Sequence, residues 1–318
     1  MSVAFVFPGQ GSQSVGMGKA LADAYLPARQ VFAEIDAALD HKLTAIMWEG
    51  RADKLMLTEN AQPALVAVSL AAMRVLEAEA GVVLAREAQF VAGHSVGEYA
   101  ALAAAGSISL ADAVRLVRIR GRAMASAVPA GAGAMAALMG VDFEQAAVIA
   151  AEAAQGQVCQ AANDNGGGQV VISGDKAAVE RAVAIAKDQG VRRAVLLRVS
   201  GPFHSALMQP AADVMRDALA RVSIRPPRVP LVANVLARPI SDPQLIVSAL
   251  IEQVTGTVRW RESVAFMAAA GVDVFYEVGA GKVLSGLVKR IAERASGVTI
   301  GLPEEVAAFK AARGAAIG

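Results

Sequence analysis

The sequence has 318 residues, of which 55% are apolar and only 4% are aromatic. This length predicts one large domain or two unequal ones with a substantial core. The 30 basic and 29 acidic residues leave a net charge of +1, which gives no electrostatic case for binding nucleic acid or an anionic membrane surface. The single cysteine, Cys159, excludes an internal disulfide and is more simply a buried small residue than a reactive thiol.

The N-terminus lacks a basic region and runs at once into the apolar stretch 3–7, which predicts a buried first strand and not a signal peptide. The most apolar windows, 64–73 and 99–108, are too short or too interrupted to span a membrane. We therefore expect a soluble cytoplasmic protein, in keeping with the reducing compartment that one cysteine suggests.

A glycine-rich loop, 8–13, follows this first strand. Four residues separate Gly11 from Gly16, where a dinucleotide-binding fingerprint has two, so a Rossmann cofactor site is excluded. The loop can still bring backbone N–H groups near another element, and Gln10 is the candidate. Segment 276–283 has tyrosine and valine where a P-loop requires glycine and serine or threonine, so no phosphate cradle and no cofactor are expected.

The stretch Gly93-His94-Ser95-Val96-Gly97 lies between an apolar run and an alanine-rich segment that favours helix. Strand, sharp turn and helix form the context in which G-x-S-x-G makes a nucleophile elbow. The glycines remove Cβ atoms that would clash, and the helix start offers N–H groups and a positive dipole end to an oxyanion. An alanine-rich turn with a packing glycine is the alternative interpretation.

From about 133 to 199 the pattern changes to β-α-β-β-α-β, the order of a ferredoxin-like unit. The elements that we expect there are strand 134–140, helix 142–154, strand 157–162, strand 169–173, helix 176–189 and strand 193–199, with a loop at 163–168.

The remainder alternates strands and helices, which favours a mainly parallel sheet covered on both sides. Its expected helices are 17–39, 61–80, 96–105, 111–127, 206–221, 242–253 and 260–270, and its expected strands are 3–7, 229–233 and 274–278. The sequence thus predicts an α/β protein with a large α/β-hydrolase-like catalytic subdomain, 1–128 and 200–318, and an inserted small ferredoxin-like subdomain, 129–199.

A nucleophilic serine needs a base, which is usually histidine, and the chain has three. His41 lies in a charged stretch and fits the surface, whereas His94 adjoins Ser95 and is better placed to shape the elbow. His204 follows a Gly-Pro break, where α/β proteins carry functional loops, so it is the candidate base, with a structural histidine as the alternative. The arginines at 115, 118, 120 and 122 spread over more than one helix face, and their pattern alone predicts mostly solvated charges.

Five segments of the chain carry a resemblance to a known family. They are Phe7-Pro8-Gly9-Gln10-Gly11-Ser12-Gln13, Gly93-His94-Ser95-Val96-Gly97-Glu98-Tyr99, Arg120-Gly121, Gly201-Pro202-Phe203-His204-Ser205-Ala206-Leu207-Met208 and Tyr276-Glu277-Val278-Gly279. In this order they closely resemble the malonyl-CoA:acyl carrier protein transacylases of bacterial fatty-acid synthesis. The resemblance runs from residue 3 to about 291.

The resemblance implies a serine nucleophile, Ser95, and a general base, His204, with no carboxylate to complete a triad. A backbone carbonyl, that of Gln253, would orient the imidazole instead. The oxyanion hole would be the N–H groups of Gln10 and Val96, which fits the two glycine-rich turns.

Arg120 would hold the free carboxylate of the malonyl group. A guanidinium offers paired donors that match a carboxylate. An acyl group without a carboxylate would leave the buried arginine unpaired, at a cost on the order of 3–5 kcal/mol. Arg120 is therefore expected to select malonyl over acetyl by exclusion as much as by attraction.

The segment 163–169 departs from the family, which often has Asn-x-Pro-Gly-Gln there. Gly167 stands in place of the proline, so we expect a more mobile loop. That mobility weakens any assignment of a substrate contact to Asn163 or Asn165.

The partners that the resemblance implies are malonyl-CoA and acyl carrier protein. Carrier proteins are acidic, so a local basic patch is expected to dock one, with ordinary solvated charges as the alternative interpretation. The candidate docking residues are Arg192, Arg193, Lys282, Lys289 and Arg290.

Three other functions stay open. A serine hydrolase or thioesterase of the α/β-hydrolase class would need an acid between serine and histidine, and no acid has motif support: Glu98 is better explained as a first-turn carboxylate favoured by the helix dipole. An acyltransferase of polyketide synthesis or malonate decarboxylation would run the same chemistry. An inactive carrier-protein-binding subunit is disfavoured by the presence of Ser95, His204 and Arg120 together.

Overall fold

The computed structural model describes residues 2–317. Its larger part is built on a six-stranded sheet with the order β10-β9-β1-β2-β7-β8, in which every neighbouring pair is parallel except β7 and β8. The strands are β1 (Ser2–Phe7), β2 (Ala88–Gly93), β7 (Leu231–Ala233), β8 (Arg238–Ile240), β9 (Val272–Val278) and β10 (Ser296–Ile300). The predicted mainly parallel sheet is confirmed.

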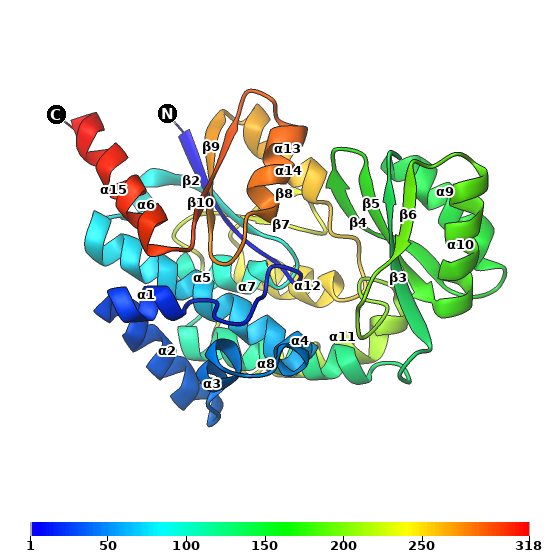
Figure 1. The fold of residues 1–318 in the computed structure, drawn as a ribbon, viewed down its shortest axis with the longest axis horizontal. Coiled ribbons are helices and arrows are strands. Elements are labelled where there is room, and N and C mark those ends of the chain that lie inside the picture. The colour runs from blue at the N-terminus through cyan, green and yellow to red at the C-terminus, as the bar shows by residue number, and fades with distance from the viewer. Residues whose placement is uncertain (1, 318) are drawn as a thin grey trace.

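Helices cover both faces of this sheet (Figure 1). They are α1 (Lys19–Ala24), α2 (Leu26–Leu39), α3 (Leu43–Trp48), α4 (Ala52–Met56), α5 (Thr58–Ala80), α6 (Leu84–Glu87), α7 (Gly97–Ala104), α8 (Leu110–Ser126), α11 (Gln209–Leu219), α12 (Pro243–Gln253), α13 (Trp260–Ala269), α14 (Val283–Ile291) and α15 (Pro303–Ile317), with a short 3₁₀ turn at Ala206–Met208.

The central strand β1 is buried on both faces, as its unbroken apolar sequence predicts. Phe5 and Phe7 pack in the core that includes α2, α5, α7 and α8. Ala4 and Val6 point to the opposite face, into a second core with α13 and α14. The sheet is therefore a rigid support between two helical layers.

Helix α5 is the one helix, among residues 2–317, that is long and apolar enough to cross a membrane. Of its most apolar stretch, 83% is buried inside the protein. It packs against α2, α7 and α8, so its composition is that of a core helix.

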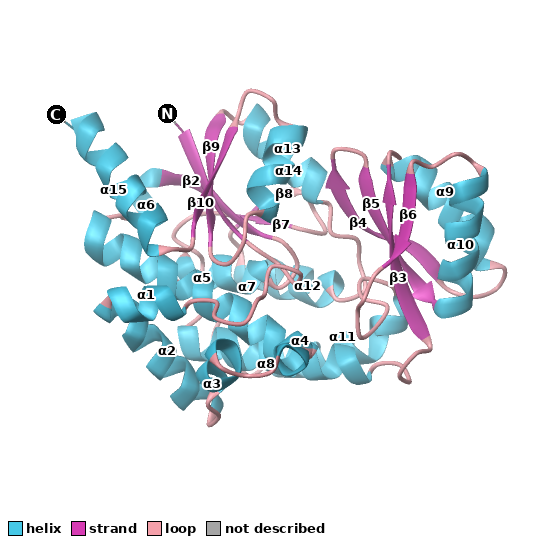
Figure 2. Cartoon of the chain, in the orientation of Figure 1, coloured by secondary structure: helices cyan, strands magenta, loops and turns pink. Residues whose placement is uncertain are grey.

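The smaller part is an antiparallel sheet with the order β4-β5-β3-β6 and its own apolar core (Figure 2). Its elements in chain order are β3 (Gly133–Met139), α9 (Phe143–Ala154), β4 (Cys159–Gly166), β5 (Gln169–Asp175), α10 (Lys176–Asp188) and β6 (Arg193–Leu196). This is the predicted β-α-β-β-α-β order, with the first and third strands in the centre of the sheet.

The bounds of several predicted elements differ from those in the structure. The expected helix 17–39 is two helices, because Tyr25 is extended and Pro27 opens the first turn of α2. The last strand of the small sheet ends at Leu196 instead of residue 199.

The prediction of a loop at 163–168 was wrong. Strand β4 continues to Gly166 by pairing with β5 through two register shifts, and the Asp164 N–H also donates to the carbonyl of Val258 at 2.9 Å. The side chains at 163–165 are buried, and only Gly167 and Gly168, both at positive φ, form the turn. The segment that was expected to be mobile is therefore mostly a buried strand.

Candidate active site

The serine turn joins the carboxyl end of β2 to the start of α7. Ser95 has a φ of 52°, in the left-handed region that non-glycine residues rarely adopt. A Cβ on Gly93 would lie 1.9 Å from the Gly97 carbonyl carbon, and one on Gly97 would lie 2.2 Å from the Phe7 oxygen. Only glycines allow a turn this tight between strand and helix, so the backbone is that of a nucleophile elbow.

The structure brings Ser95 and His204 together across 109 positions of sequence. Ser95 Oγ lies 2.8 Å from His204 Nε2, and His204 Nδ1 lies 2.7 Å from the main-chain oxygen of Gln253. Because a carbonyl only accepts, Nδ1 carries the proton and Nε2 is free to accept from the serine hydroxyl. No carboxylate within the described residues hydrogen-bonds this imidazole.

His204 is buried, with only 5% of its surface exposed. Burial, followed by the nearby charge of Arg120, lowers the pKa of His204 to about 3. The hydrogen bond to the Gln253 carbonyl opposes this shift. The ring is therefore held unprotonated, with its acceptor nitrogen facing the serine.

Gln10 and Val96 line the same cavity as Ser95. The first loop reaches the elbow closely: the His94 N–H donates to the Phe7 carbonyl at 3.0 Å, and a Cβ on Gly9 would lie 2.6 Å from the His94 oxygen. Within residues 2–317 neither the Gln10 nor the Val96 N–H has a hydrogen-bond partner. Two donors thus remain available next to Ser95.

Arg120 is fully buried, unlike the exposed Arg115 and Arg122 on the same helix, α8. Its Nη2 atom donates to Ser95 Oγ at 3.0 Å and to Gln253 Oε1 at 2.8 Å, and its Nη1 atom donates to Gln62 Oε1 at 3.0 Å. Nε has no partner in the described part of the chain. The guanidinium therefore faces the serine and has a donor to spare.

The cavity has a volume of about 400 Å³ and lies between the two sheets. The large part contributes Gln10, Ser95, Arg120 and His204. The small part contributes residues from β3, β4, β5 and the segment after β6: Met135, Asn163, Asn165, Gln169, Val171, Leu197, Arg198 and Val199. A substrate in this cavity would contact both parts.

Sequence reasoning missed two polar residues that hold the site. Asn234, just after β7, accepts from the Ser95 N–H at 2.7 Å and donates to the Gly93 carbonyl at 2.7 Å. Gln62 on α5 contacts Arg120, as given above. The only signal for Asn234 was its position, since β7 lies next to β2 and both strands end at the same edge of the sheet.

Glu98 differs from its expected state. It lies in the first turn of α7, as expected, but it is buried as well: it is 1% exposed and accepts from the Asn234 N–H at 2.6 Å and from Gln253 Nε2. A charged residue within an alanine-rich run was the available signal, because that helix had no solvent-facing stripe of other polar residues.

Two polar contacts fasten the small sheet to the elbow and its surroundings. His94 Nε2 lies 2.8 Å from Asn165 Oδ1, and Arg261 Nε donates to Asp164 Oδ2 at 2.8 Å. His94 therefore hydrogen-bonds to strand β4 of the small sheet, whereas the sequence predicted only that it shapes the elbow.

Residues 4–302 match the acyl transferase domain family. The chain belongs to the acyl transferase family.

This acyl transferase is 48% identical over 305 residues to the malonyl CoA-acyl carrier protein transacylase of Escherichia coli K12. The alignment covers 96% of this chain and 97% of the relative. It is 45% identical to the Bacillus subtilis protein of the same name, covering 96% and 95%.

Two solved structures of similar fold are described as a malonyltransferase and a malonyl-transacylase. The acyl-carrier-protein-S-malonyltransferase of Bartonella henselae is 54% identical, with a TM-score of 0.96 over 99% of this chain and 100% of that one. A malonyl-transacylase solved in complex with a type II polyketide acyl-carrier protein is 41% identical, with a TM-score of 0.94 over 98% and 100%.

The predicted docking residues of this acyl transferase are all exposed, and none forms an ion pair within the described residues. Arg290 and Arg192 flank one turn: a Cβ on Gly167 would lie 2.7 Å from Arg290 Cδ, and one on Gly140 would lie 3.1 Å from Arg192 Cβ. The Gly140 N–H donates to the Gly168 carbonyl at 2.7 Å, which joins the two glycine positions.

The other docking candidates are less closely grouped. Lys282 precedes Val283, which lines the cavity. Lys289 lies in the last turn of α14, and Arg193 begins β6.

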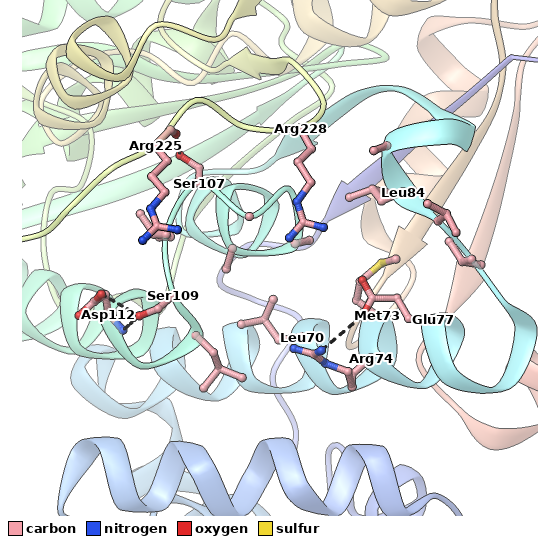
Figure 3. Close-up of a pocket in the computed structure, with 18 of the residues that line it drawn as sticks. Leu70, Met73, Arg74, Glu77, Leu84, Ser107, Ser109, Asp112, Arg225 and Arg228 are labelled. Atoms are coloured by element: carbon pink, nitrogen blue, oxygen red, sulfur yellow. Dashed lines mark hydrogen bonds and ion pairs between the residues drawn. The ribbon is translucent and has the colours of Figure 1, made fainter.

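A second cavity, of about 590 Å³, lies beyond the C-terminal end of α7 (Figure 3). Arg225 and Arg228 point into it from the connection before β7, and Arg74 and Glu77 line it from α5. It contains none of the predicted site residues, so the cavity at Ser95 is the candidate active site.

Proposed function

We propose that this acyl transferase moves a malonyl group from malonyl-CoA to the phosphopantetheine thiol of acyl carrier protein, through a malonyl ester on Ser95. The observation that carries the proposal is the meeting of three side chains in one cavity: Ser95 Oγ lies 2.8 Å from His204 Nε2 and 3.0 Å from Arg120 Nη2. The names of the relatives support the same substrate and acceptor.

In the first half-reaction Ser95 Oγ attacks the thioester carbonyl while His204 Nε2 takes the hydroxyl proton. The Gln253 carbonyl stabilises the imidazolium that forms, through the Nδ1 hydrogen bond. The free N–H groups of Gln10 and Val96 stabilise the oxyanion of the tetrahedral intermediate. Collapse breaks the carbon–sulfur bond, the CoA thiolate takes the proton from His204, and a malonyl ester remains on Ser95.

Arg120 is the proposed partner of the malonyl carboxylate. It is buried, lines the cavity and donates to Ser95 Oγ, so a carboxylate bound in the cavity can accept from it. An acetyl group brings no carboxylate to this charge. Arg120 thus favours malonyl over acetyl.

In the second half-reaction the carrier protein's thiol attacks the ester while His204 accepts its proton. The bond between the malonyl carbon and Ser95 Oγ then breaks, and His204 returns the proton to Ser95 Oγ. Free CoA leaves before the acceptor reacts, so the kinetics are ping-pong. The basic residues Arg192, Arg193, Lys282, Lys289 and Arg290 are the proposed docking surface for an acidic carrier protein.

The division of the chain and its location complete the proposal. We assign 1–128 and 200–318 to the catalytic subdomain and 129–199 to the small one, since β3 to β6 form a sheet and core of their own. The protein supplies fatty-acid synthesis in the cytoplasm. Polyketide synthesis is the second candidate pathway, favoured by the similarity to a transacylase in complex with a polyketide carrier protein.

The test is acyl-enzyme labelling. Malonyl-CoA labelled in the malonyl group should leave label on the wild type and none on Ser95→Ala, and holo carrier protein should then remove the label from the wild type. Equal labelling of both proteins would refute the proposal. Rapid release of free malonate without carrier protein would support a hydrolase instead.

A further inference from the structure

Several buried polar groups beside the serine elbow have no role in the proposed mechanism. Glu98, Asn234 and the side chain of Gln253 are each less than 2% exposed and hydrogen-bond one another. Through them the carboxylate of Glu98 is connected to both Ser95 and Arg120. This network rests on α7, α12 and the segment after β7.

The Gln253 amide has one possible orientation. Its nitrogen faces two acceptors, the Ser95 carbonyl at 2.9 Å and the Glu98 carboxylate, and its oxygen faces Arg120, which can only donate. If the amide were flipped, its NH2 group would face the guanidinium, which can only donate. Its oxygen would then face the Ser95 carbonyl oxygen and a Glu98 carboxylate oxygen. Glu98 is therefore one of the groups that fix which end of Gln253 meets Arg120.

Both oxygens of Glu98 face donors. Oε1 accepts from the Asn234 N–H at 2.6 Å, and Oε2 accepts from Gln253 Nε2. The carboxylate form suits this arrangement best, because both of its oxygens only accept and each faces a donor. The same segment of chain carries Asn234 Oδ1, which accepts from the Ser95 N–H at 2.7 Å.

We propose that Glu98, in its ionised form, is the positioning residue of the site. It holds Asn234 and the Gln253 amide, and these two groups in turn hold Ser95 and Arg120 in their positions relative to each other. It contacts neither the serine hydroxyl nor the guanidinium itself and acts through its two partners. The inference rests on the proposed malonyl transfer and adds a residue that this mechanism needs but does not name.

Burial raises the pKa of Glu98 to about 8, against the pull of its two donors and of Arg120. The other titratable groups around Glu98 do not titrate at a pH near 8. Arg120 stays protonated, burial raises the pKa of Tyr99 to about 12, and burial lowers the pKa of His204 to about 3. A raised carboxyl pKa means that the charged, working form is lost as pH falls through about 8.

The experiment measures single-turnover labelling of Ser95 by malonyl-CoA between about pH 6.5 and 9.5, without carrier protein, so that no acceptor thiol titrates. The wild-type rate is expected to fall about tenfold as pH drops, with a midpoint near 8. Glu98→Gln has one acceptor oxygen for two donors, so at about pH 9.5 it should be at least about tenfold slower and show no such midpoint. Glu252→Gln, an exposed carboxylate on the same helix as Gln253, is the matched control and should behave as wild type.

A Glu98→Gln protein that keeps the wild-type rate, or is slow but keeps the midpoint near 8, would overturn the proposal. A wild-type rate that is flat over this range would also overturn it, which decides the case even if the variant does not fold. Absence of any label on Ser95 in the wild type would instead refute the proposed function.

Discussion

At the scale of single residues, the site depends on backbone conformations that cost energy. Ser95 and His204 both have positive φ, at 52° and 58°. Hydrogen bonds to neighbouring groups stabilise these conformations. The Asn234 side chain accepts from the Ser95 N–H, and the Gln253 carbonyl accepts from the His204 imidazole. The proposed nucleophile and base are therefore placed by contacts of their neighbours as much as by their own side chains.

The pKa of His204 gives a pH prediction. A base with the ordinary histidine pKa of about 6.5 would lose activity about tenfold per pH unit below that value. Because burial and Arg120 lower the pKa of His204 to about 3, the ring stays neutral in mild acid. The labelling rate should therefore level off between about pH 6.5 and 5 in protein that circular dichroism shows to be folded. A continued fall of about tenfold per unit would show that the imidazole titrates normally.

Sequence reasoning found the residues that belong to ordered motifs and missed those that do not. Ser95, His204 and Arg120 lie in recognisable segments, and the structure places them within one cavity. Asn234 and Gln62 have no local sequence signature, because the site residues that they contact are 58 to 141 positions away in the chain.

At the scale of elements, the elbow depends on a close approach between β1 and α7. Gly97→Ala would place a Cβ 2.2 Å from the main-chain oxygen of Phe7, and backbone cannot yield as a side chain can. We expect a loss of about 1–3 kcal/mol in the free energy of unfolding, measured by urea denaturation, together with loss of labelling.

Gly286→Ala is the matched control for this substitution. Gly286 lies within α14, and a Cβ there would meet no atom within 4 Å. Alanine should stabilise that helix by about 0.5–1 kcal/mol and leave labelling intact. Equal stability of the two variants would contradict the close packing of the elbow.

The element pattern was predictable where the hydrophobic period was strong. The strands β1 and β9 and the order of the small unit followed from apolar runs and turn residues. The polar stretch Asn163-Asp164-Asn165 has the composition of a loop, but its side chains find partners in His94 and Arg261 and the backbone continues as strand β4. Tertiary hydrogen bonds overrode local composition there.

At the scale of the whole molecule, the active-site cavity lies between two separately packed cores. The total charge is near neutral, but the exposed Arg290 lies against Gly167 and the exposed Arg192 lies against Gly140, whose N–H donates to the Gly168 carbonyl. This arrangement fits docking of an acidic protein at the junction, while the carrier's thiol enters the cavity.

Charge reversal tests this surface. Lys289→Glu with Arg290→Glu should raise the KM for carrier protein about tenfold at low salt and flatten its salt dependence, without changing labelling by malonyl-CoA. Arg225→Glu with Arg228→Glu makes the same change in charge at the second cavity, and its kinetics should match the wild type. Equal effects of the two double variants would show that only net charge matters.

The central claim is that Ser95, His204 and Arg120 act together on a malonyl group, and acyl selectivity tests it most directly. Transfer from malonyl-CoA and acetyl-CoA should be compared for the wild type and Arg120→Ala. The account predicts that the substitution lowers malonyl kcat/KM by about 100-fold or more, consistent with about 3 kcal/mol for a broken buried pair, and leaves acetyl transfer unchanged or faster. An Arg120→Ala enzyme that still prefers malonyl by the wild-type ratio would contradict it.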